Sequence, residues 1–185
     1  MLGRLFSRAP AGLLRSSLEK AIDAVVIIDG RNHVTFFNAA AERLWGYERN
    51  EVLGRNVKML VPQQFRANHD ELVDANRQGG ADKIVGTSRE LELERKDGTT
   101  VHVSLALSKA RRGFSTVYTA FVRDITAEWE TKEQIRQTLE QAIDAVVSID
   151  EHNNVTFFNS AAERLWGYAR EEVVRAFWGP HNQKM

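Results

Sequence analysis

The chain has 185 residues, enough for one domain of ordinary size and part of another. Its 25 basic and 25 acidic residues balance, so charge gives no reason to expect nucleic acid or an anionic membrane as a partner. The absence of cysteine excludes disulfides, zinc thiolate sites, iron-sulfur clusters and cysteine-based flavin photochemistry. Because no apolar run approaches about 20 residues, we expect no membrane span in this chain and a cytoplasmic location.

The first 17 residues have three arginines among apolar residues and no acid. This pattern predicts a leading helix or tail, and an amphipathic targeting segment is the alternative interpretation.

A near-duplicate segment is the strongest organisational signal. The stretch LEKAIDAVVIIDGRNHVTFFNAAAERLWGYERNEV, which starts at Leu18, returns from Leu139 as LEQAIDAVVSIDEHNNVTFFNSAAERLWGYAREEV, an offset of 121 residues. Roughly three quarters of the aligned positions are identical, and the likeness then stops. The second copy therefore predicts two strands and a helix without their sheet partners, poorly packed unless a neighbouring chain covers them.

The first copy predicts a hairpin followed by short helices. AVVIID and HVTFFN are β-rich runs joined by the turn GRN. Asn38 is placed to cap a helix that Gly46 ends. After Pro62 we expect one helix that runs through His69 to Gly79-Gly80 and turns the imidazole inward, on the same side as Phe65 and either Leu72 or Val73.

The remainder of this region predicts three long strands. SRELELERKDGTTVHVSLALSKA alternates polar and apolar residues on both sides of Lys96-Asp97-Gly98, which is typical of an antiparallel hairpin, and STVYTAFVRDIT supplies the last strand. We expect an α+β fold: a five-stranded antiparallel sheet with short helices on one face and flanking helices outside it. A ligand-sized hollow between that face and the helices is the expected site.

Residues 126–143 form a helical pattern, with Thr126 as the expected N-cap. Ile135, Leu139 and Ala142 make a narrow apolar seam. The seam fits pairing with a second helix, and hence a homodimer through the flanking helices, or else a solvent-exposed connector.

Three motifs together resemble the PAS family: FFNAAAERLWGY, RKDGTT and FVRDIT. The resemblance covers about Leu18 to Thr126 and implies the PAS fold. The expected organisation is a leading helix or tail at 1–17, a PAS domain at 18–126, a helical linker at 127–140 and a truncated second PAS repeat at 141–185.

One further stretch, LVPQQFRANHDELVDANRQGG with the following VGTSRELELERKDG, is similar to the heme-binding oxygen-sensor branch of the family, the FixL-like and Dos-like domains. That resemblance implies heme b (iron protoporphyrin IX), with His69 as the iron ligand and Arg89, twenty residues later, facing a bound gas. The same alignment places three polar residues where the heme propionates emerge: Asn76, Arg77 and Lys83. Thr87 stands where Dos-like domains have a methionine ligand, and it cannot supply a thioether.

Elementary chemistry agrees with these roles. Neutral imidazole is a good ligand for heme iron, and Leu105 and Leu107, which alternate inward along one strand, would wall the pocket. A guanidinium can donate a charge-assisted hydrogen bond to polarised dioxygen. The alternatives are a core histidine at position 69 and, for Arg89, a surface partner of Glu90 or Glu92. Thr87 could also bond a ligand or a water.

These patterns predict a sensory module that binds heme b, senses O2 or another diatomic gas such as CO or NO, and relays the ligand state through its C-terminal helix to an unknown output domain or protein. The first alternative is a cofactor-free PAS module for dimerisation or protein interaction, and the second is a flavin-binding redox sensor. No nucleophile-base set, phosphate loop or metal-ligand cluster is recognisable, so we expect no enzyme activity.

Overall fold

A computed structural model describes residues 11–77, 85–112 and 115–173. The chain divides into two compact units, which meet after Thr126. Each unit is described by itself.

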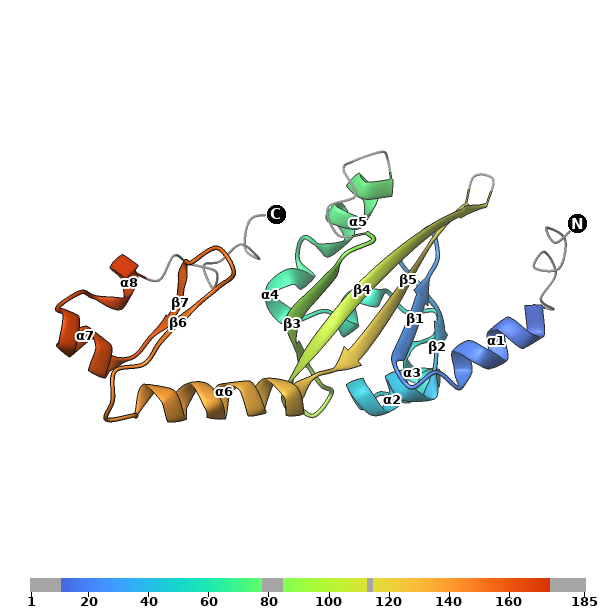
Figure 1. Cartoon of the computed structure of the whole chain (residues 1–185). Coiled ribbons are helices and arrows are strands. Elements are labelled where there is room, and N and C mark those ends of the chain that lie inside the picture. The colour runs from blue at the N-terminus through green and yellow to red at the C-terminus, as the bar shows by residue number, and fades with distance from the viewer. Residues whose placement is uncertain (1–10, 78–84, 113–114, 174–185) are drawn as a thin grey trace, which may run out of the picture. The chain divides into compact units, whose positions relative to one another are not determined.

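In the first unit a leading helix and two strands are followed by a run of short helices and then by three strands (Figure 1). Its helices and strands are α1 Ala11–Glu19, β1 Ala24–Ile28, β2 Val34–Phe37, α2 Ala39–Trp45, α3 Arg49–Val52, the 3-10 helix η1 Val57–Leu60, α4 Gln63–Arg66, α5 His69–Arg77, β3 Ser88–Glu94, β4 Thr100–Arg112 and β5 Ser115–Asp124. The second unit begins with the helix that follows β5. Its elements are α6 Thr126–Glu140, β6 Val147–Ile149, β7 Val155–Phe158, α7 Ser160–Trp166 and α8 Arg170–Val173.

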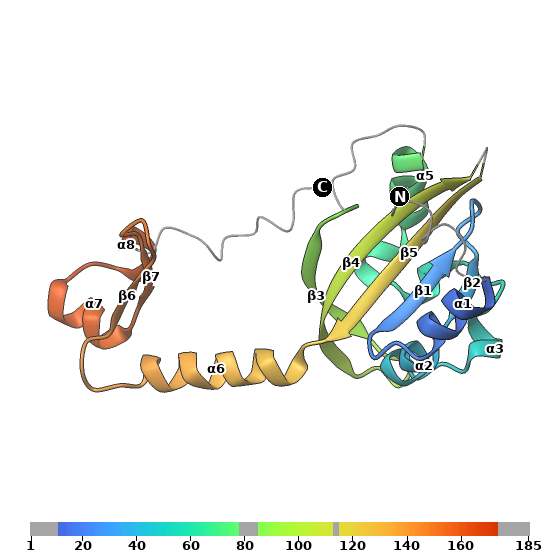
Figure 2. The same cartoon turned by 45° about the vertical axis from the view of Figure 1, so that its right-hand side comes forward.

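The sheet of the first unit has five antiparallel strands in the order β2-β1-β5-β4-β3. The first strand, β1, thus lies between its hairpin neighbour and the last strand, with Val26 opposite Ala120. β4 and β5 are the two long strands and run across the sheet as one ribbon (Figure 2). The predicted α+β class and PAS-type sheet are confirmed.

The core lies between one face of this sheet and the short helices. Alternate residues of β1 and β4, among them Val26 and Val103, pack in one cluster with Trp45 of α2 and Leu60 of η1. Trp45 also donates a hydrogen bond of 3.0 Å from Nε1 to the backbone oxygen of Leu60, which satisfies the indole inside the core.

Local sequence signals account for the start and end of α2. The Oδ1 atom of Asn38 accepts hydrogen bonds of 2.9 Å from the backbone nitrogens of Ala41 and Val25. Gly46 closes the helix with φ 75°, a left-handed conformation that glycine adopts without a Cβ clash. Both predicted boundaries are confirmed.

The single helix expected around His69 is wrong. The chain forms α4 and α5 with a break between Arg66 and His69. Phe65 and Leu72, expected to point inward, are 39% and 38% exposed. A local contact lies at this break, because Arg66 Nε donates 2.7 Å to the oxygen of Val61 and ties α4 to the preceding turn.

The expected N-cap of α6 is also displaced. Thr126 is the first helical residue, and its backbone nitrogen donates 2.9 Å to Oδ1 of Asp124, two residues earlier. None of the helices in the described ranges has the length and apolar character needed to span a membrane.

Candidate functional site

His69 is the first residue of α5 and is half-buried. The Nδ1 atom is inaccessible and has no hydrogen-bond partner among the described residues. Burial lowers the pKa of His69 below its ordinary value, against the opposing charge of Asp70. The imidazole is therefore neutral near pH 7, the state in which it can act as a metal ligand.

The face of α5 that carries His69 is directed at the sheet side. Val73, one helical turn later, packs against the core cluster. Of the two positions that the helical spacing allowed, Val73 and not Leu72 shares the inward side of this helix with His69.

The beginning of α5 is fastened by Asp70, the neighbour of His69. Its Oδ1 atom accepts 3.0 Å from Nδ2 of Asn32, and its two carboxylate oxygens accept 3.1 and 3.0 Å from Nδ2 of Asn56. Lys58 Nζ lies 3.9 Å from the same carboxylate. Asn32 is 3% exposed and belongs to the β1–β2 turn, where it adopts φ 63°.

The other end of α5 is fastened by two residues that the sequence assigned to cofactor propionates. Oδ1 of Asn76 accepts 2.8 Å from the hydroxyl of Tyr118 and 2.8 Å from Nζ of Lys109. Arg77 donates 2.7 Å from one terminal nitrogen to Oδ1 of Asn32, and 2.5 Å from the other to Asp74. Lys83, the third propionate candidate, lies outside the described residues.

Asn32 therefore bridges both ends of the helix, because its amide donates to Asp70 and accepts from Arg77. We call these three residues the Asn32 bridge. Sequence reasoning missed it, together with Lys109 and Tyr118. Only the turn-forming character of GRN hinted that Asn32 would occupy a special backbone position.

Arg89 lies on the core side of the sheet. It is directly opposite Leu105 in the β3–β4 ladder and is half-buried. It shares a face of β3 with Leu91 and the buried Leu93, whereas Glu90 and Glu92 are exposed on the other face. The strand alternation therefore argues against the surface pairing of Arg89 with those glutamates.

The two wall residues lie on the same face of β4. Leu105 packs against the core cluster, and Leu107, two residues on, is half-buried opposite Ala120. Thr87 is exposed and precedes β3, directly after Gly86 with φ 81°. The structure thus groups Arg89 with Leu105 and Leu107 and places Thr87 at the edge of that group.

Two surface hollows of the described chain lie away from the space between the helices and the sheet. One follows α6, lined by Thr131 and Ile135 among others, and the second lies beside Arg15 and Phe36. Val73, Leu91 and Leu105 pack against the core where the hollow was expected.

The donor chemistry nevertheless fits a porphyrin iron better than a bare metal ion. No group of three or more His, Asp or Glu residues in the described ranges could hold an ion. Heme iron needs only one protein ligand, and His69 offers a neutral imidazole whose Nδ1 has no hydrogen-bond partner among the described residues.

Comparison with known proteins supports the family assignment at the level of sequence. A family described as the PAS fold matches residues 12–125 and 133–176. Oxygen sensor protein DosP of Escherichia coli (strain K12) is 39% identical over 169 residues, which is 89% of this chain and 21% of that protein. Sensor protein FixL of Bradyrhizobium diazoefficiens is 35% identical over 124 residues, 67% of this chain and 25% of that protein. The chain thus spans at most a quarter of the length of these two relatives.

Solved structures agree on the fold. An RNA-binding Light-Oxygen-Voltage receptor superposes with a TM-score of 0.55 at 26% identity, covering 75% of this chain and 39% of that one. The PAS domain of Bordetella pertussis BvgS gives a TM-score of 0.53 at 14% identity, covering 71% and 97%, and shows the fold alone. With the sheet order, the capped α2 and the sequence matches taken together, this chain belongs to the PAS family and is a sensory domain related to DosP and FixL.

Proposed function

We propose that this PAS module binds heme b through His69 and senses O2 or another diatomic gas, CO or NO. One observation carries the proposal: His69 keeps a buried ring nitrogen without a hydrogen-bond partner among the described residues, and burial lowers its pKa. A core histidine that only served packing would find a donor or acceptor, since a buried polar atom left unpaired is costly. The relatedness to a protein named as an oxygen sensor supports the same conclusion.

The bound heme would supply an iron centre that takes up the gas. His69 holds that centre, and Leu105 and Leu107 exclude water from it. Arg89, held on the same sheet face as Leu105, donates a charge-assisted hydrogen bond to a polar ligand. Thr87 supplies no thioether to compete for the ligand position.

Asn76, Arg77 and Lys83 are the proposed propionate partners. For Asn76 and Arg77 this requires an exchange of partners, because the first accepts from Tyr118 and Lys109 and the second donates to Asn32. Binding of the cofactor would therefore loosen contacts at the C-terminal end of α5. Cofactor binding would in this way change the contacts between α5 and the sheet.

Hemin titration followed by absorption tests the proposal. Wild-type protein should develop one Soret band that saturates at one equivalent, and His69→Ala should lose it. His152→Ala is the matched control, because its side chain is 74% exposed and lies in the second unit. An unchanged Soret band in His69→Ala would contradict the assignment of the iron ligand.

A cofactor-free interaction module is the second candidate function. It is favoured by the partners that Asn76 and Arg77 already have within the protein, and by the packed side chains where a hollow was expected. The same titration separates the two, since a cofactor-free module would show no saturable band. Visible flavin absorbance in the purified protein would instead indicate the flavin-binding alternative.

We further propose that the module is non-catalytic, located in the cytoplasm, and passes its state through α6 to a separate output domain. β5 leads directly into α6, whose Ile135 is 56% exposed and available for pairing with the same helix of a second chain. Light scattering of the wild type and Ile135→Glu should show a dimer and a monomer respectively.

A further inference from the structure

The helix α6 ends on the second repeat as α1 ends on the first. The last residue of α1 is Glu19 and the last residue of α6 is Glu140, and 121 residues separate them, which is the offset of the two repeats. The end of α6 therefore stands in the second repeat where a leading helix stands in the first.

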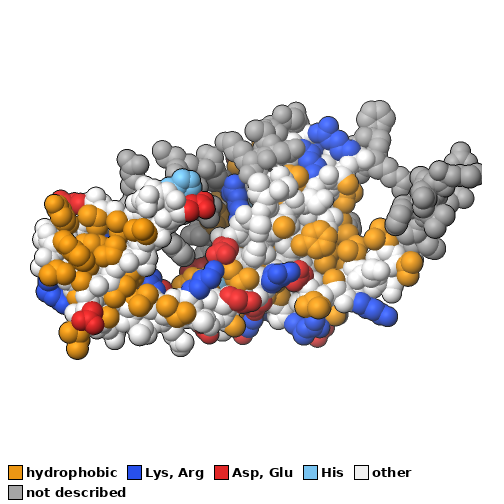
Figure 3. Space-filling model, in the orientation of Figure 1, with side chains coloured by type: hydrophobic (Ala, Val, Ile, Leu, Met, Phe, Trp, Pro, Cys, Tyr) orange, Lys and Arg blue, Asp and Glu red, His pale blue; other side chains and the backbone are white. Residues whose placement is uncertain are grey.

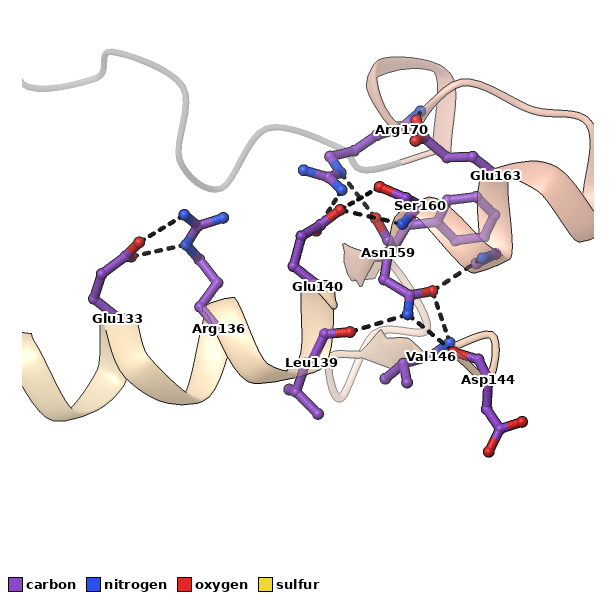
Figure 4. A network of polar contacts seen from close by, with 12 residues as sticks. Glu133, Arg136, Leu139, Glu140, Asp144, Val146, Asn159, Ser160, Glu163 and Arg170 are labelled. Carbon is purple, nitrogen blue, oxygen red and sulfur yellow. Dashed lines mark hydrogen bonds and ion pairs between the residues drawn. The ribbon is translucent and has the colours of Figure 1, made fainter. Parts of the chain in front are cut away.

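Arg170 joins three elements at the end of α6 (Figure 4). One terminal nitrogen of its guanidinium donates 2.5 Å to Oε2 of Glu140 in α6, and its Nε donates 2.8 Å to the backbone oxygen of Phe158 in β7. Its backbone nitrogen donates 2.7 Å to Oε1 of Glu163 in α7. An isolated ion pair at the surface contributes little, but a residue that bonds three elements at once holds them against one another.

A buried asparagine fastens the same end of the helix from the inside. Nδ2 of Asn159 donates 3.0 Å to the oxygen of Leu139, the penultimate residue of α6, and 3.0 Å to that of Asp144 (Figure 4). Its Oδ1 accepts 2.9 Å from the backbone nitrogens of Val146 and Ala162. The amide of Asn159, which is fully buried, thus makes all of its hydrogen bonds within the second unit.

The first repeat holds α1 by the same contacts. Arg49 donates from a terminal nitrogen to Glu19, the last residue of α1, and donates 2.7 Å from Nε to the oxygen of Phe37. Nδ2 of Asn38 donates 3.0 Å to the oxygen of Leu18. The duplicated unit therefore includes the contacts to its leading helix, and in the second repeat that helix is the end of α6.

The second repeat holds its helix with a further hydroxyl. Ser160 stands in the place of Ala39, and its Oγ donates 2.5 Å to Oε1 of Glu140. The backbone nitrogen of Ser160 donates 3.2 Å to the same oxygen. Hydrogen bonds from Ser160 and Arg170 hold the pKa of Glu140 below its ordinary value, so the carboxylate is charged at neutral pH.

Polar contacts, rather than a shared apolar core, join the helix to the second repeat. None of the residues of α6, all of which the structure describes, is buried. In the view of Figure 3 the hydrophobic side chains of the second repeat gather over α7 and the β6–β7 pair. A change of charge at Glu140 should therefore open this contact without removing packed apolar area.

The other end of α6 is bonded to the first unit. The backbone nitrogen of Ile125 donates 2.9 Å to the oxygen of His102 in β4, and Oγ1 of Thr126 accepts 3.2 Å from the backbone nitrogen of His102. Between the two ends, the carboxylate of Glu133 accepts 2.8 and 2.7 Å from Arg136, which supports the helix. The helix thus has bonded contacts with one repeat at each end.

We propose that α6 is shared by the two repeats, as the last element of the first and the leading helix of the second, and that Glu140, Ser160 and Arg170 form a joint through which a change in the first unit reaches the second repeat. The joint makes the end of α6 and the second repeat move as one body. The second repeat is then the first receiver of the signal. The signalling half of this inference rests on the proposed function, whereas the joint does not depend on what the first unit binds.

Spin-label distances test the joint, and the natural chain has no cysteine to interfere. One label is placed on Lys132→Cys in α6 and the other on Glu151→Cys, whose side chain is 87% exposed in the turn between β6 and β7. We expect one narrow distance distribution. Glu140→Lys should broaden it, because it sets two positive charges against each other at Arg170. Ser160→Ala leaves both charges in place and should broaden it less.

Glu133→Lys is the matched control, because it sets the same charge against Arg136 inside α6. It should leave the distribution narrow. Far-UV circular dichroism checks that the variants are folded, and Ser160→Ala decides if Glu140→Lys unfolds the second repeat. Equal widths for Ser160→Ala and the unsubstituted labelled chain, or for Glu140→Lys and Glu133→Lys, would overturn the joint.

Hydrogen exchange with and without hemin tests the signalling half. The backbone N–H groups of Val146 and Ala162, both bonded to Asn159, report on the second repeat. Hemin should change their exchange rates several-fold in the natural chain and not in Glu140→Lys, while the Soret band saturates at one equivalent in both.

Two results would overturn transmission through the joint: unchanged exchange in the heme-loaded natural chain, or a change that persists in Glu140→Lys. Absence of a Soret band from both proteins would instead contradict the proposed function, and the label distances would then decide the joint by themselves.

Discussion

Nδ2 of Asn32 donates a hydrogen bond of 3.0 Å to Oδ1 of Asp70, and so joins the β1–β2 turn to the residue beside His69, 38 positions later in the chain. The same amide accepts from Arg77 at the far end of α5. The β1–β2 turn, far earlier in the chain, thus fixes the orientation of the helix that carries the candidate iron ligand.

Loss of the Asn32 bridge should destabilise the first unit. Glycine keeps the positive φ of this position, so Asn32→Gly removes the amide without adding a Cβ clash. Hydrogen bonds to charged partners that are partly exposed support an expected loss of about 1–2 kcal/mol in the free energy of unfolding. Urea denaturation measures it.

Asn153→Gly is the matched control, because Asn153 has φ 61° and is exposed in the second unit. An equal effect of the two substitutions on the unfolding of the first unit would show that the bridge contributes nothing.

The protonation of His69 should make the stability of the cofactor-free protein depend on pH. Burial lowers the folded-state pKa below the ordinary value of 6.5, so the unfolded chain binds the proton more readily. The free energy of unfolding is therefore at its full value above about pH 6.5 and decreases as the pH drops toward the folded-state pKa. Urea midpoints between about pH 5 and 7.5 should show this slope in wild type and in His152→Gln, but not in His69→Gln.

The ferrous heme complex should be five-coordinate, because Thr87 cannot supply a thioether to the open position. Its visible spectrum should have the broad bands of a high-spin complex, and Thr87→Met should shift the spectrum toward a low-spin, six-coordinate form. Sharp low-spin bands in the unmutated ferrous protein would mean that another side chain fills the position.

Arg89 should discriminate between gases. A charge-assisted hydrogen bond to polarised dioxygen contributes about 1.5–3 kcal/mol, whereas carbon monoxide gains little from a guanidinium. Arg89→Ala should therefore weaken O2 affinity by roughly ten- to a hundredfold and CO affinity far less. Gas titrations of Arg89→Ala and of Arg43→Ala, an exposed arginine on α2, measure the difference. Equal losses for both gases would show that Arg89 only supports the pocket.

The elements that the sequence predicts well are those whose causes are local. The helix start at Asn38 and its end at Gly46 depend on a side-chain cap and a left-handed residue, both readable within a few positions. The long β3–β4 hairpin follows from strict alternation around the Lys96-Asp97-Gly98 turn. The position of Arg89 on the core face is also a consequence of that alternation.

The elements that the sequence predicts poorly depend on distant partners. The way α5 is held is one example, because Asp70 is bonded to Asn32, 38 positions earlier, and no short window of sequence contains both residues. The hydrogen-bond partners of Asn76 were not predictable for the same reason, since Lys109 and Tyr118 lie on strands much later in the chain.

The pairing of β1 with β5 also has a consequence for biosynthesis. β1 leaves the ribosome roughly ninety residues before Tyr118, which at about 5–20 residues per second is a delay of about 5–20 s. The first repeat is therefore complete and waiting when β5 emerges, whereas Val147 follows later still. Refolding from denaturant releases β1 and β5 together and removes that delay, so closure of the sheet then depends on a search by two strands roughly ninety residues apart in the chain.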